Sequence, residues 1–134
     1  MHQGHTWLLD IAHNPQSIRS LVTYLEQEKR PIHLVFSALG DKDVAQMLAL
    51  LKDCVYAWWI APLQAPRAAT LAELKSAGEQ VGLAQVTWCD SITDACCSAQ
   101  LSAQQDDVLL DVLLVACGSF LTVEQVGDWL GVNL

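Results

Sequence analysis

Two side chains near the start of the chain have the types and spacing to bind a nucleotide or an anion. Asp10 ends an apolar run, and His13 follows three residues later beside an Asn-Pro pair. A carboxylate in such a position can accept hydrogen bonds from ribose hydroxyls. An imidazole beside a helix N-terminus can donate to a phosphate or a carboxylate. Spacing alone leaves a second interpretation open for each residue, that of a solvated turn residue next to a helix start.

The Asn14-Pro15 pair is typical of a helix start. The side-chain oxygen of Asn14 can accept from a free backbone N–H of the first turn, and Pro15 suits the first helical position because its missing N–H costs nothing there. The apolar run before the pair predicts a buried strand at 7–11. Asp10 and His13 are therefore expected at the carboxyl end of a strand, the edge where open α/β sheets bind ligands.

Three further candidates lie in predicted loops. Lys42, in a Gly-Asp-Lys-Asp loop, could pair with an anionic ligand as a point charge or be solvated between its two aspartates. Arg67 could be an anion clamp or a loop anchor. Ser119 follows a glycine and could offer its hydroxyl and backbone N–H to a carboxylate, although spacing alone favours a plain turn.

Composition limits the class of protein. The chain has 134 residues, 52% of them hydrophobic, and a net charge of −8, which suits one compact domain that binds neither nucleic acid nor an anionic membrane. No apolar run approaches the roughly 20 residues needed to span a bilayer, and the N-terminus lacks the pattern of a signal peptide. We therefore expect a cytoplasmic protein. Any phosphate site must depend on helix N-termini, one or two lysines, or another domain.

The absence of several motifs is also informative. The five cysteines are odd in number, lack a C-x-x-C spacing and mostly lie in apolar runs, so we expect buried reduced thiols. The four histidines show no ligand spacing, and we predict no metal bound by this chain alone. There is no G-x-G-x-x-G and no G-x-x-x-x-G-K-[ST], which argues against a self-contained dinucleotide or P-loop site. A complete enzyme is not visible.

Apolar periodicity divides the chain into alternating strands and helices. The predicted strands are 7–11, 32–36, 55–61, 84–88 and 112–117, and a helix follows each of them. This alternation predicts a three-layer, Rossmann-like, doubly wound and mostly parallel sheet with helices on both faces and right-handed crossovers. The loops at 10–14, 37–43, 62–69 and 118–122 should then emerge at one edge of the sheet.

Local signals set the boundaries of several elements. The first helix should end in 26–30, with its cations late as the helix dipole prefers, before Pro31. Thr70 to Glu73 reads as a capping box for the third helix, and Thr122 to Gln125 as another for the last helix. The tetrapeptide at 107–110 is repeated at once, and we place the last strand in the second copy. The Trp58–Trp59 pair is assigned to core packing.

Four stretches together resemble one enzyme family. Residues 9–15, Leu-Asp-Ile-Ala-His-Asn-Pro, resemble the D-x-A-H-N-P signature of the C-terminal domain of Mur-type ATP-dependent ligases, and 39–43 resemble the D-K-D loop that follows it. Residues 61–70 resemble an A-P-L-x-x-P-R-x-A-T stretch, and 115–120 a V-x-C-G-S-F stretch, of the folylpolyglutamate synthase/dihydrofolate synthase branch. The four stretches occur in the right order and cover most of the chain.

The resemblance implies that 1–134 is a glutamate-ligase C-terminal domain. In such an enzyme ATP phosphorylates the carboxylate of dihydropteroate or a folate such as tetrahydrofolate, and the amine of L-glutamate attacks the acyl phosphate. The P-loop and the Mg²⁺ ligands would belong to a preceding N-terminal ATPase domain, so that the isolated chain is inactive and the whole enzyme a monomer. The resemblance assigns Asp10 and Asn14 to the nucleotide, His13 to the reacting groups, and Ser119 and Lys42 to glutamate.

Some features depart from the family pattern. Leu121 stands where the family often has a histidine, which leaves any role of that histidine in glutamate binding vacant, and the repeat at 107–114 looks like an insertion. Met1 directly before this domain indicates an expressed fragment. Two alternatives stay open at this point: the C-terminal domain of a Mur ligase of cell-wall synthesis, and a non-catalytic α/β binding module.

Overall fold

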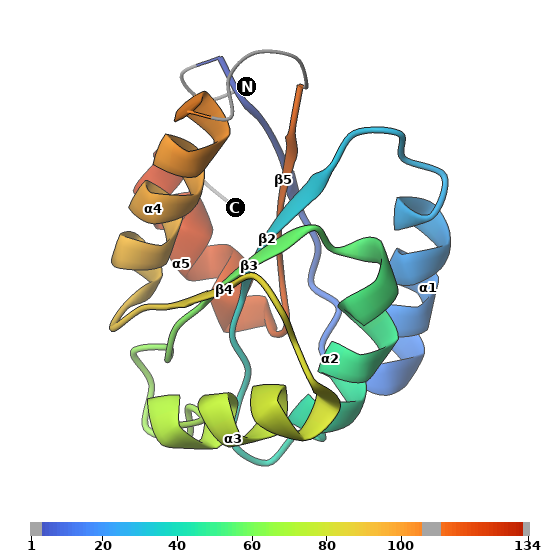
Figure 1. Cartoon of the computed structure of the whole chain (residues 1–134). Coiled ribbons are helices and arrows are strands. Elements are labelled where there is room, and N and C mark those ends of the chain that lie inside the picture. The colour runs from blue at the N-terminus through green and yellow to red at the C-terminus, as the bar shows by residue number, and fades with distance from the viewer. Residues whose placement is uncertain (1–3, 106–110, 133–134) are drawn as a thin grey trace.

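A parallel sheet forms the centre of the computed structural model, which describes residues 4–105 and 111–132 (Figure 1). The strand order is β1-β5-β2-β3-β4, and every neighbouring pair is parallel. The strands are β1 (Thr6–Leu9), β2 (Ile32–Phe36), β3 (Ala57–Ile60), β4 (Val86–Trp88) and β5 (Leu113–Cys117). The predicted doubly wound parallel sheet is confirmed.

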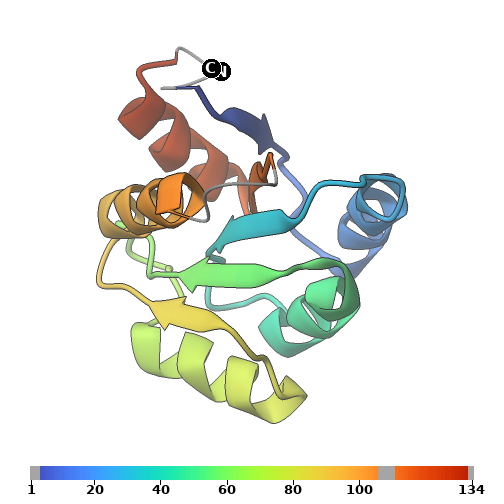
Figure 2. The same ribbon diagram turned by 45° about the horizontal axis from the view of Figure 1, so that its top comes forward.

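Helices cover both faces of the sheet, giving three layers (Figure 2). One face carries the first three α-helices and the other face the last two, each set with its own apolar cluster. The helices are α1 (Pro15–Leu25), α2 (Val44–Leu51), α3 (Leu71–Val81), α4 (Ile92–Gln105) and α5 (Phe120–Leu130), and a short 3₁₀ helix, η1 (Lys52–Cys54), follows α2. Within the described residues, no helix combines the length and the apolar character that crossing a membrane requires.

The two adjacent tryptophans of β3 show how the sheet separates the two clusters. Successive side chains of a strand point to opposite faces. Trp58 therefore packs among α1 to α3, whereas Trp59 packs against α4, where its Nε1 donates to Ser98 Oγ at 2.9 Å. The assignment of this pair to core packing is confirmed.

The carboxyl ends of β1 and β5 form a topological switch point. The strand β5 lies between β1 and β2, and the chain leaves β1 for α1 on one face but leaves β5 for α5 on the other. Gly118 follows β5 with φ +118°, and a Cβ on it would lie 1.9 Å from Ser37 O at the end of β2. Only glycine allows the segment after β5 to approach the end of β2 so closely. Ligands of open α/β sheets bind in the crevice outside such a point.

Four strands are shorter than predicted, β5 by a single residue because it covers 113–117 rather than 112–117. The strand β1 ends at Leu9, because the Asp10 side chain accepts a hydrogen bond from Ala12 N at 2.8 Å and turns the chain out of the sheet. The strand β3 covers 57–60 rather than 55–61, and η1 occupies the chain just before it. The strand β4 begins only after Gln85, which has φ 59°. The strand at 32–36 was predicted correctly.

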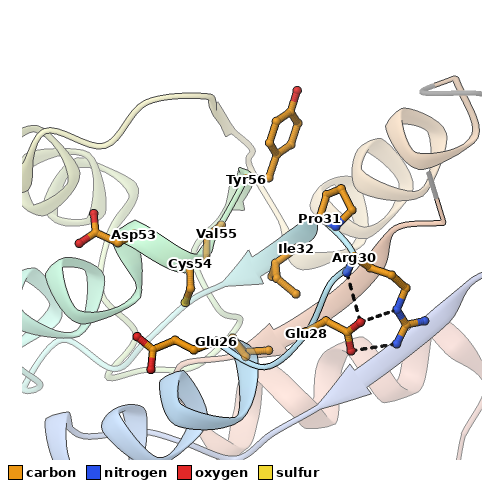
Figure 3. Close-up of a pocket in the computed structure, with 10 residues that line it drawn as sticks. Glu26, Glu28, Arg30, Pro31, Ile32, Asp53, Cys54, Val55 and Tyr56 are labelled. Atoms are coloured by element: carbon orange, nitrogen blue, oxygen red, sulfur yellow. Dashed lines mark hydrogen bonds and ion pairs between the residues drawn. The ribbon is translucent and has the colours of Figure 1, made fainter. Parts of the chain in front are cut away.

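The amino edge of the sheet carries a hollow of about 630 Å³ between the chain before β2 and the chain before β3 (Figure 3). Its lining includes Glu26, Glu28 and Asp53, three acids, with Arg30 as a cation. Acidic walls disfavour phosphates. This hollow therefore lies at the wrong edge and has the wrong charge for the anion chemistry that the sequence predicts.

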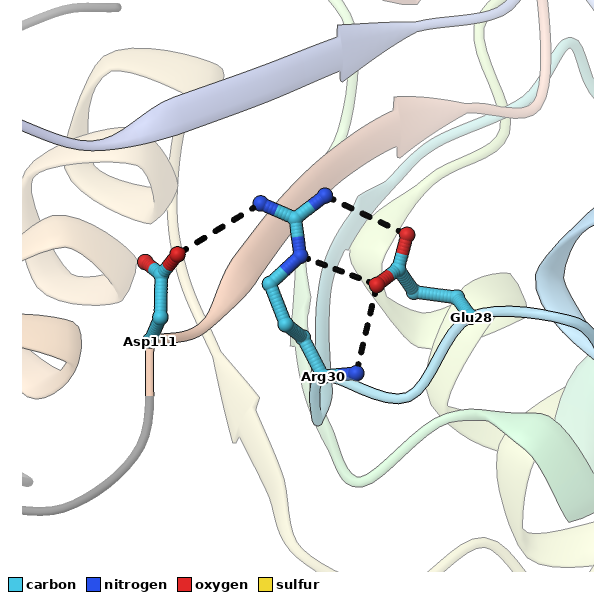
Figure 4. Close-up of polar contacts among 3 residues, drawn as sticks. All are labelled: Glu28, Arg30 and Asp111. Atoms are coloured by element: carbon cyan, nitrogen blue, oxygen red, sulfur yellow. Dashed lines mark hydrogen bonds and ion pairs between the residues drawn. The ribbon is translucent and has the colours of Figure 1, made fainter.

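The predicted C-terminus of the first helix is wrong. The helix α1 ends at Leu25 with no basic residue in its last turn. Arg30 instead binds the Glu28 carboxylate through Nε at 2.9 Å and Nη2 at 3.2 Å, and it approaches Asp111 at 3.7 Å (Figure 4). The Arg30 guanidinium lowers the pKa of Glu28, chiefly through these hydrogen bonds. This arginine ties the chain before β2 to the chain before β5 rather than capping the helix.

The start of the last helix also differs from the prediction. Ser119, not Thr122, is the N-cap of α5, and its Oγ accepts from Thr122 N at 3.0 Å. The helix therefore starts three residues earlier than expected, and Thr122 is its third residue. The capping box of α3 is confirmed, with reciprocal hydrogen bonds between Thr70 and Glu73. The first copy of the repeated tetrapeptide, 107–110, lies outside the described residues, and β5 begins within the second copy, at Leu113, one residue later than predicted.

Candidate active site

Asp10 is held at the switch point by its own loop. Its backbone N donates to Ala116 O at 3.0 Å, which extends the pairing of β1 with β5 by one bond. Its Oδ1 accepts from Ala12 N at 2.8 Å, while Gly118 N donates to Ala12 O at 2.9 Å. The half-buried carboxylate thus stands where the β1 and β5 loops join. It has the position predicted for a group that accepts hydrogen bonds from a ligand.

His13 is exposed on the same loop, and its ring has a defined orientation. Its Nδ1 lies 3.1 Å from Ile11 O, and because a carbonyl oxygen only accepts, Nδ1 must carry the proton. In the neutral ring Nε2 is then an acceptor, and the Asn14 amide nitrogen lies 3.5 Å from it. A neutral imidazole held in this way can accept a proton or a hydrogen bond from a reacting amine.

Asn14 serves mainly as the N-cap of α1. Its Oδ1 accepts from both the backbone N and the Oγ of Ser17, each at 2.8 Å, and Ser17 Oγ in turn accepts from the backbone N of His13 and of Asn14. The capping prediction is confirmed. Sequence reasoning missed Ser17, although its position three residues after an Asn N-cap was the available signal.

Ser119 lies on the second loop of the site and is buried, with 3% of its surface exposed. Its Oγ accepts from Thr122 N and lies 3.1 Å from Thr122 Oγ1, which itself donates to Ser37 O at 3.0 Å. The sequence analysis did not identify Thr122 or Ser37 as part of the candidate site. The spacing between Ser119 and Thr122 is the same as that between Asn14 and Ser17 at α1. Both helices that begin at the switch point therefore have a polar N-cap residue and a hydroxyl-bearing residue three positions later.

Lys42 belongs to a neighbouring part of the same edge. The loop after β2 is bound to the loop after β3, with Gly40 N donating to Arg67 O at 2.8 Å and Ala69 N to Ala38 O at 3.0 Å. Lys42 lines a hollow of about 450 Å³ between α2 and α3, together with Glu73. The structure therefore brings Asp10, His13 and Ser119 to the ends of β1 and β5, and sets Lys42 farther along the edge.

Arg67 anchors its loop through its backbone. Its carbonyl accepts the hydrogen bond from Gly40, and its side chain is exposed. Of the two interpretations left open by the sequence, this contact supports the loop anchor. It does not involve the guanidinium.

The cysteine next to the site is not a nucleophile. Cys117 ends β5 and is fully buried, and this burial raises the pKa of its thiol, with the Asp10 charge adding to the effect. Burial also raises the pKa of Cys54 to about 11 and that of Cys96 to about 12. All five cysteines are free, and three of them are buried, as expected, whereas Cys97 is exposed.

The sequence and the fold both have known relatives. A family model described as "Mur ligase, glutamate ligase domain" matches residues 1–116. The dihydrofolate synthase/folylpolyglutamate synthase of Escherichia coli (strain K12) is 35% identical over 121 residues, which are 89% of this chain and 26% of the relative.

Solved structures agree with the sequence match. Mycobacterium tuberculosis folylpolyglutamate synthase, complexed with ADP and AMPPCP, aligns with TM-score 0.83 and 29% identity, covering 92% of this chain and 29% of that one. A bifunctional folylpolyglutamate synthase/dihydrofolate synthase with Mn, AMPPNP and L-glutamate bound aligns with TM-score 0.75 and 32% identity, covering 98% and 31%. The chain thus spans between a quarter and a third of the length of these three relatives.

Proposed function

Because the chain belongs to the Mur ligase glutamate ligase domain family, we propose that it is the C-terminal domain of a folylpolyglutamate synthase/dihydrofolate synthase. The whole enzyme is an ATP-dependent ligase that joins L-glutamate to dihydropteroate or a folate such as tetrahydrofolate. A preceding ATPase domain, which this chain does not contain, supplies the P-loop. The shared 35% identity with the E. coli enzyme and the nucleotides and glutamate bound to solved relatives support this assignment.

One observation carries the proposal. The D-x-A-H-N-P loop and the G-S-F loop meet at the switch point, where Gly118 N donates to Ala12 O at 2.9 Å. Two stretches that resemble the family, more than 100 residues apart, thus form one surface at the edge where open α/β sheets bind ligands. The chain has a net charge of −8, which disfavours an independent polyphosphate site and suits a domain that completes a site built mainly by another.

The proposed reaction has two steps. The γ-phosphoryl group of ATP passes to the carboxylate of the acceptor, giving an acyl phosphate and ADP. The amine of L-glutamate then attacks the acyl carbon, the new amide bond forms, phosphate leaves and the amine loses a proton. In this scheme Asp10 and Asn14 lie on the nucleotide side, and His13, through Nε2, faces the incoming amine and takes its proton.

The glutamate side of the site is assigned to the loops after β5 and β2. Ser119, at the start of α5, and Lys42, beside α2, are the proposed contacts. Because the Ser119 hydroxyl is buried and already hydrogen-bonded, its main contribution is to hold the first turn of α5 toward the ligand. Lys42 reaches the same ligand only as a distant positive charge, since it lies against α3.

The divalent cation needs ligands from elsewhere. The described residues include no group of three or more His, Cys, Asp or Glu side chains placed to hold a metal ion. In the proposal the Mg²⁺ that accompanies ATP is bound by the preceding domain, and a solved relative holds Mn together with AMPPNP.

We also propose that the whole enzyme is a cytoplasmic monomer. Five free cysteines, three of them buried, suit a reducing compartment. Size-exclusion chromatography with light scattering of the full-length enzyme tests the oligomeric state.

An acceptor panel tests the proposed function. The full-length enzyme that contains this chain is supplied with ATP, Mg²⁺ and labelled L-glutamate, and the acceptor is varied between dihydropteroate, tetrahydrofolate and a muramoyl peptide. We expect label to enter dihydropteroate or tetrahydrofolate and ADP to form in equal amount. Label only in the muramoyl peptide would place the chain in a cell-wall ligase, and no ATP-dependent label in any acceptor would exclude a ligase.

A further inference from the structure

Thr122 occupies the junction between the two loops assigned to glutamate. It is fully buried, with 0% of its surface exposed, although its hydroxyl is polar. Its Oγ1 donates to Ser37 O at the end of β2 and lies 3.1 Å from Ser119 Oγ after β5. We propose that Thr122 is a positioning residue that fixes the Ser119 hydroxyl and the first turn of α5 for L-glutamate. This inference rests on the proposed function, because it concerns the glutamate side of that site.

The hydrogen bonds allow only one placement of the protons. Ser37 O is a carbonyl oxygen and can only accept, so the single hydroxyl proton of Thr122 points to it. In the contact between the two hydroxyls, Ser119 must therefore be the donor. Ser119 Oγ also accepts from Thr122 N at 3.0 Å. Both the proton of Ser119 and one of its lone pairs are thus bound to Thr122.

This arrangement determines what Ser119 can offer to a ligand. With its proton directed to Thr122, its oxygen can only accept from a ligand, so it suits an amine or ammonium donor and not a carboxylate. The sequence alone had left a hydroxyl contact to a carboxylate open, beside the plain turn that spacing favours. Without the Thr122 hydroxyl, the Ser119 proton is free to rotate, and the preference for the amine side of an amino acid is lost.

Thr122 also connects the loop after β2 to this site. The Ser37 carbonyl that it binds begins the loop 37–43, which carries Lys42, and Gly118 packs against the same carbonyl. The hydroxyl of Ser37 is buried and has no hydrogen-bond partner among the described residues. Its backbone carbonyl, by contrast, accepts the hydrogen bond from the Thr122 hydroxyl. The Thr122 hydroxyl thus adds a side-chain hydrogen bond between α5 and the end of β2 to the pairing of β2 with β5.

Steady-state kinetics of Thr122→Val and Thr122→Ser in the full-length enzyme test the proposal. Valine keeps the shape but removes the hydroxyl, and we expect KM for L-glutamate to rise roughly three- to tenfold, the loss of about one net hydrogen bond. KM for ATP should stay within experimental error of the wild type. Serine retains the hydroxyl and should restore KM for L-glutamate to near the wild-type value. If the valine variant does not fold, Thr122→Ala is measured by the same criteria.

Two controls separate this role from a structural one. Thr23→Val removes a hydroxyl that donates to Arg19 O on the exposed face of α1 and should leave all constants unchanged. Adding Thr122→Val to Ser119→Ala should cause no further rise in KM for L-glutamate, because Thr122 acts through Ser119. An unchanged KM for L-glutamate in Thr122→Val, or an equal change in both KM values that serine does not rescue, would overturn the inference. A wild-type enzyme that joins no glutamate would instead refute the proposed function.

Discussion

In the proposed site, the carboxyl group of Asp10 divides its two oxygens between structure and ligand. Oδ1 accepts from Ala12 N and shapes the turn that ends β1, and this turn meets the β5 loop at Gly118. An asparagine retains an oxygen for that turn but not the charge. The two roles of Asp10 can therefore be separated by substitution.

Asp10→Asn in the full-length enzyme should weaken the use of ATP without unfolding the domain. The loss of a charge-assisted hydrogen bond costs about 1.5–3 kcal/mol, so we expect KM for ATP to rise roughly 10- to 150-fold. The melting temperature should stay within a few degrees of the wild type, because asparagine can still accept from Ala12 N. An unchanged KM for ATP would remove Asp10 from the nucleotide site.

Removing the hydroxyl of Ser37 and removing that of Ser119 should change the free energy of unfolding in opposite directions. Ser37 Oγ is buried and has no hydrogen-bond partner among the described residues, and an unpaired buried hydroxyl lowers stability. We expect Ser37→Ala to leave the free energy of unfolding unchanged or to raise it by about 1 kcal/mol in urea titrations. Ser119→Ala, which removes a paired hydroxyl and an N-cap, should lower it by a similar amount. A clear loss of stability in Ser37→Ala would mean that a partner such as a bound water satisfies the hydroxyl.

At the level of elements, most of the fold follows from local sequence signals. Periodicity and capping residues predicted the order of strands and helices, the strand at 32–36 and the starts of α1 and α3. These signals are strong because apolar spacing and N-cap chemistry act over a few neighbouring residues. The grouping of candidate loops at one edge follows directly from a parallel sheet.

Several errors involve contacts between distant segments. Arg30 looked like a helix C-terminal cation because the sequence did not show that α1 ends at Leu25; Arg30 instead binds Glu28, two residues before it, and approaches the distant Asp111 before β5. Thr122 looked like an N-cap because the true acceptor of its hydroxyl, the backbone carbonyl of Ser37, is 85 residues away. The position of Lys42 beside α3 likewise depends on the packing of two helices. Local patterns carry no information on such pairs.

The N-cap of α1 can be tested as an element by itself. Asn14→Ala removes the oxygen that accepts from Ser17, and we expect a loss of about 1 kcal/mol in the free energy of unfolding, with Asn14→Ser recovering much of it. Asp43→Ala, which removes the cap of α2 away from the switch point, is the matched control and should cost a similar amount. An Asn14→Ala variant as stable as the wild type would contradict the capping geometry.

At the scale of the whole molecule, buried thiols on both faces of the sheet make stability sensitive to alkaline pH. Burial raises the pKa of Cys54 to about 11 and that of Cys96 from its ordinary 9.0 to about 12. Above pH 9 the unfolded chain releases these protons before the folded chain does, so the stability present below pH 9 falls as pH rises toward 11–12. Urea titrations of the wild type and of Cys96→Ala between pH 8 and 10.5 measure the slope. A variant with the same slope as the wild type would exclude a contribution from Cys96.

The molecule as a whole provides one half of the proposed site. Its switch point holds an anchored carboxylate, an oriented imidazole and two helix starts, and in the proposal the net charge of −8 leaves polyphosphate binding to a partner domain. This division of labour also explains why a chain of this size, spanning 26% of the E. coli relative, carries four family-like stretches without a P-loop.

ATP turnover by the isolated chain and by the same chain joined to its preceding ATPase domain tests this division most directly. Both proteins are supplied with ATP, Mg²⁺, dihydropteroate and L-glutamate, and the release of ADP is measured. We expect no ADP above background from the folded isolated chain, and glutamate-dependent ADP release from the joined protein. Turnover by the isolated chain, or a joined protein that ignores glutamate, would contradict it.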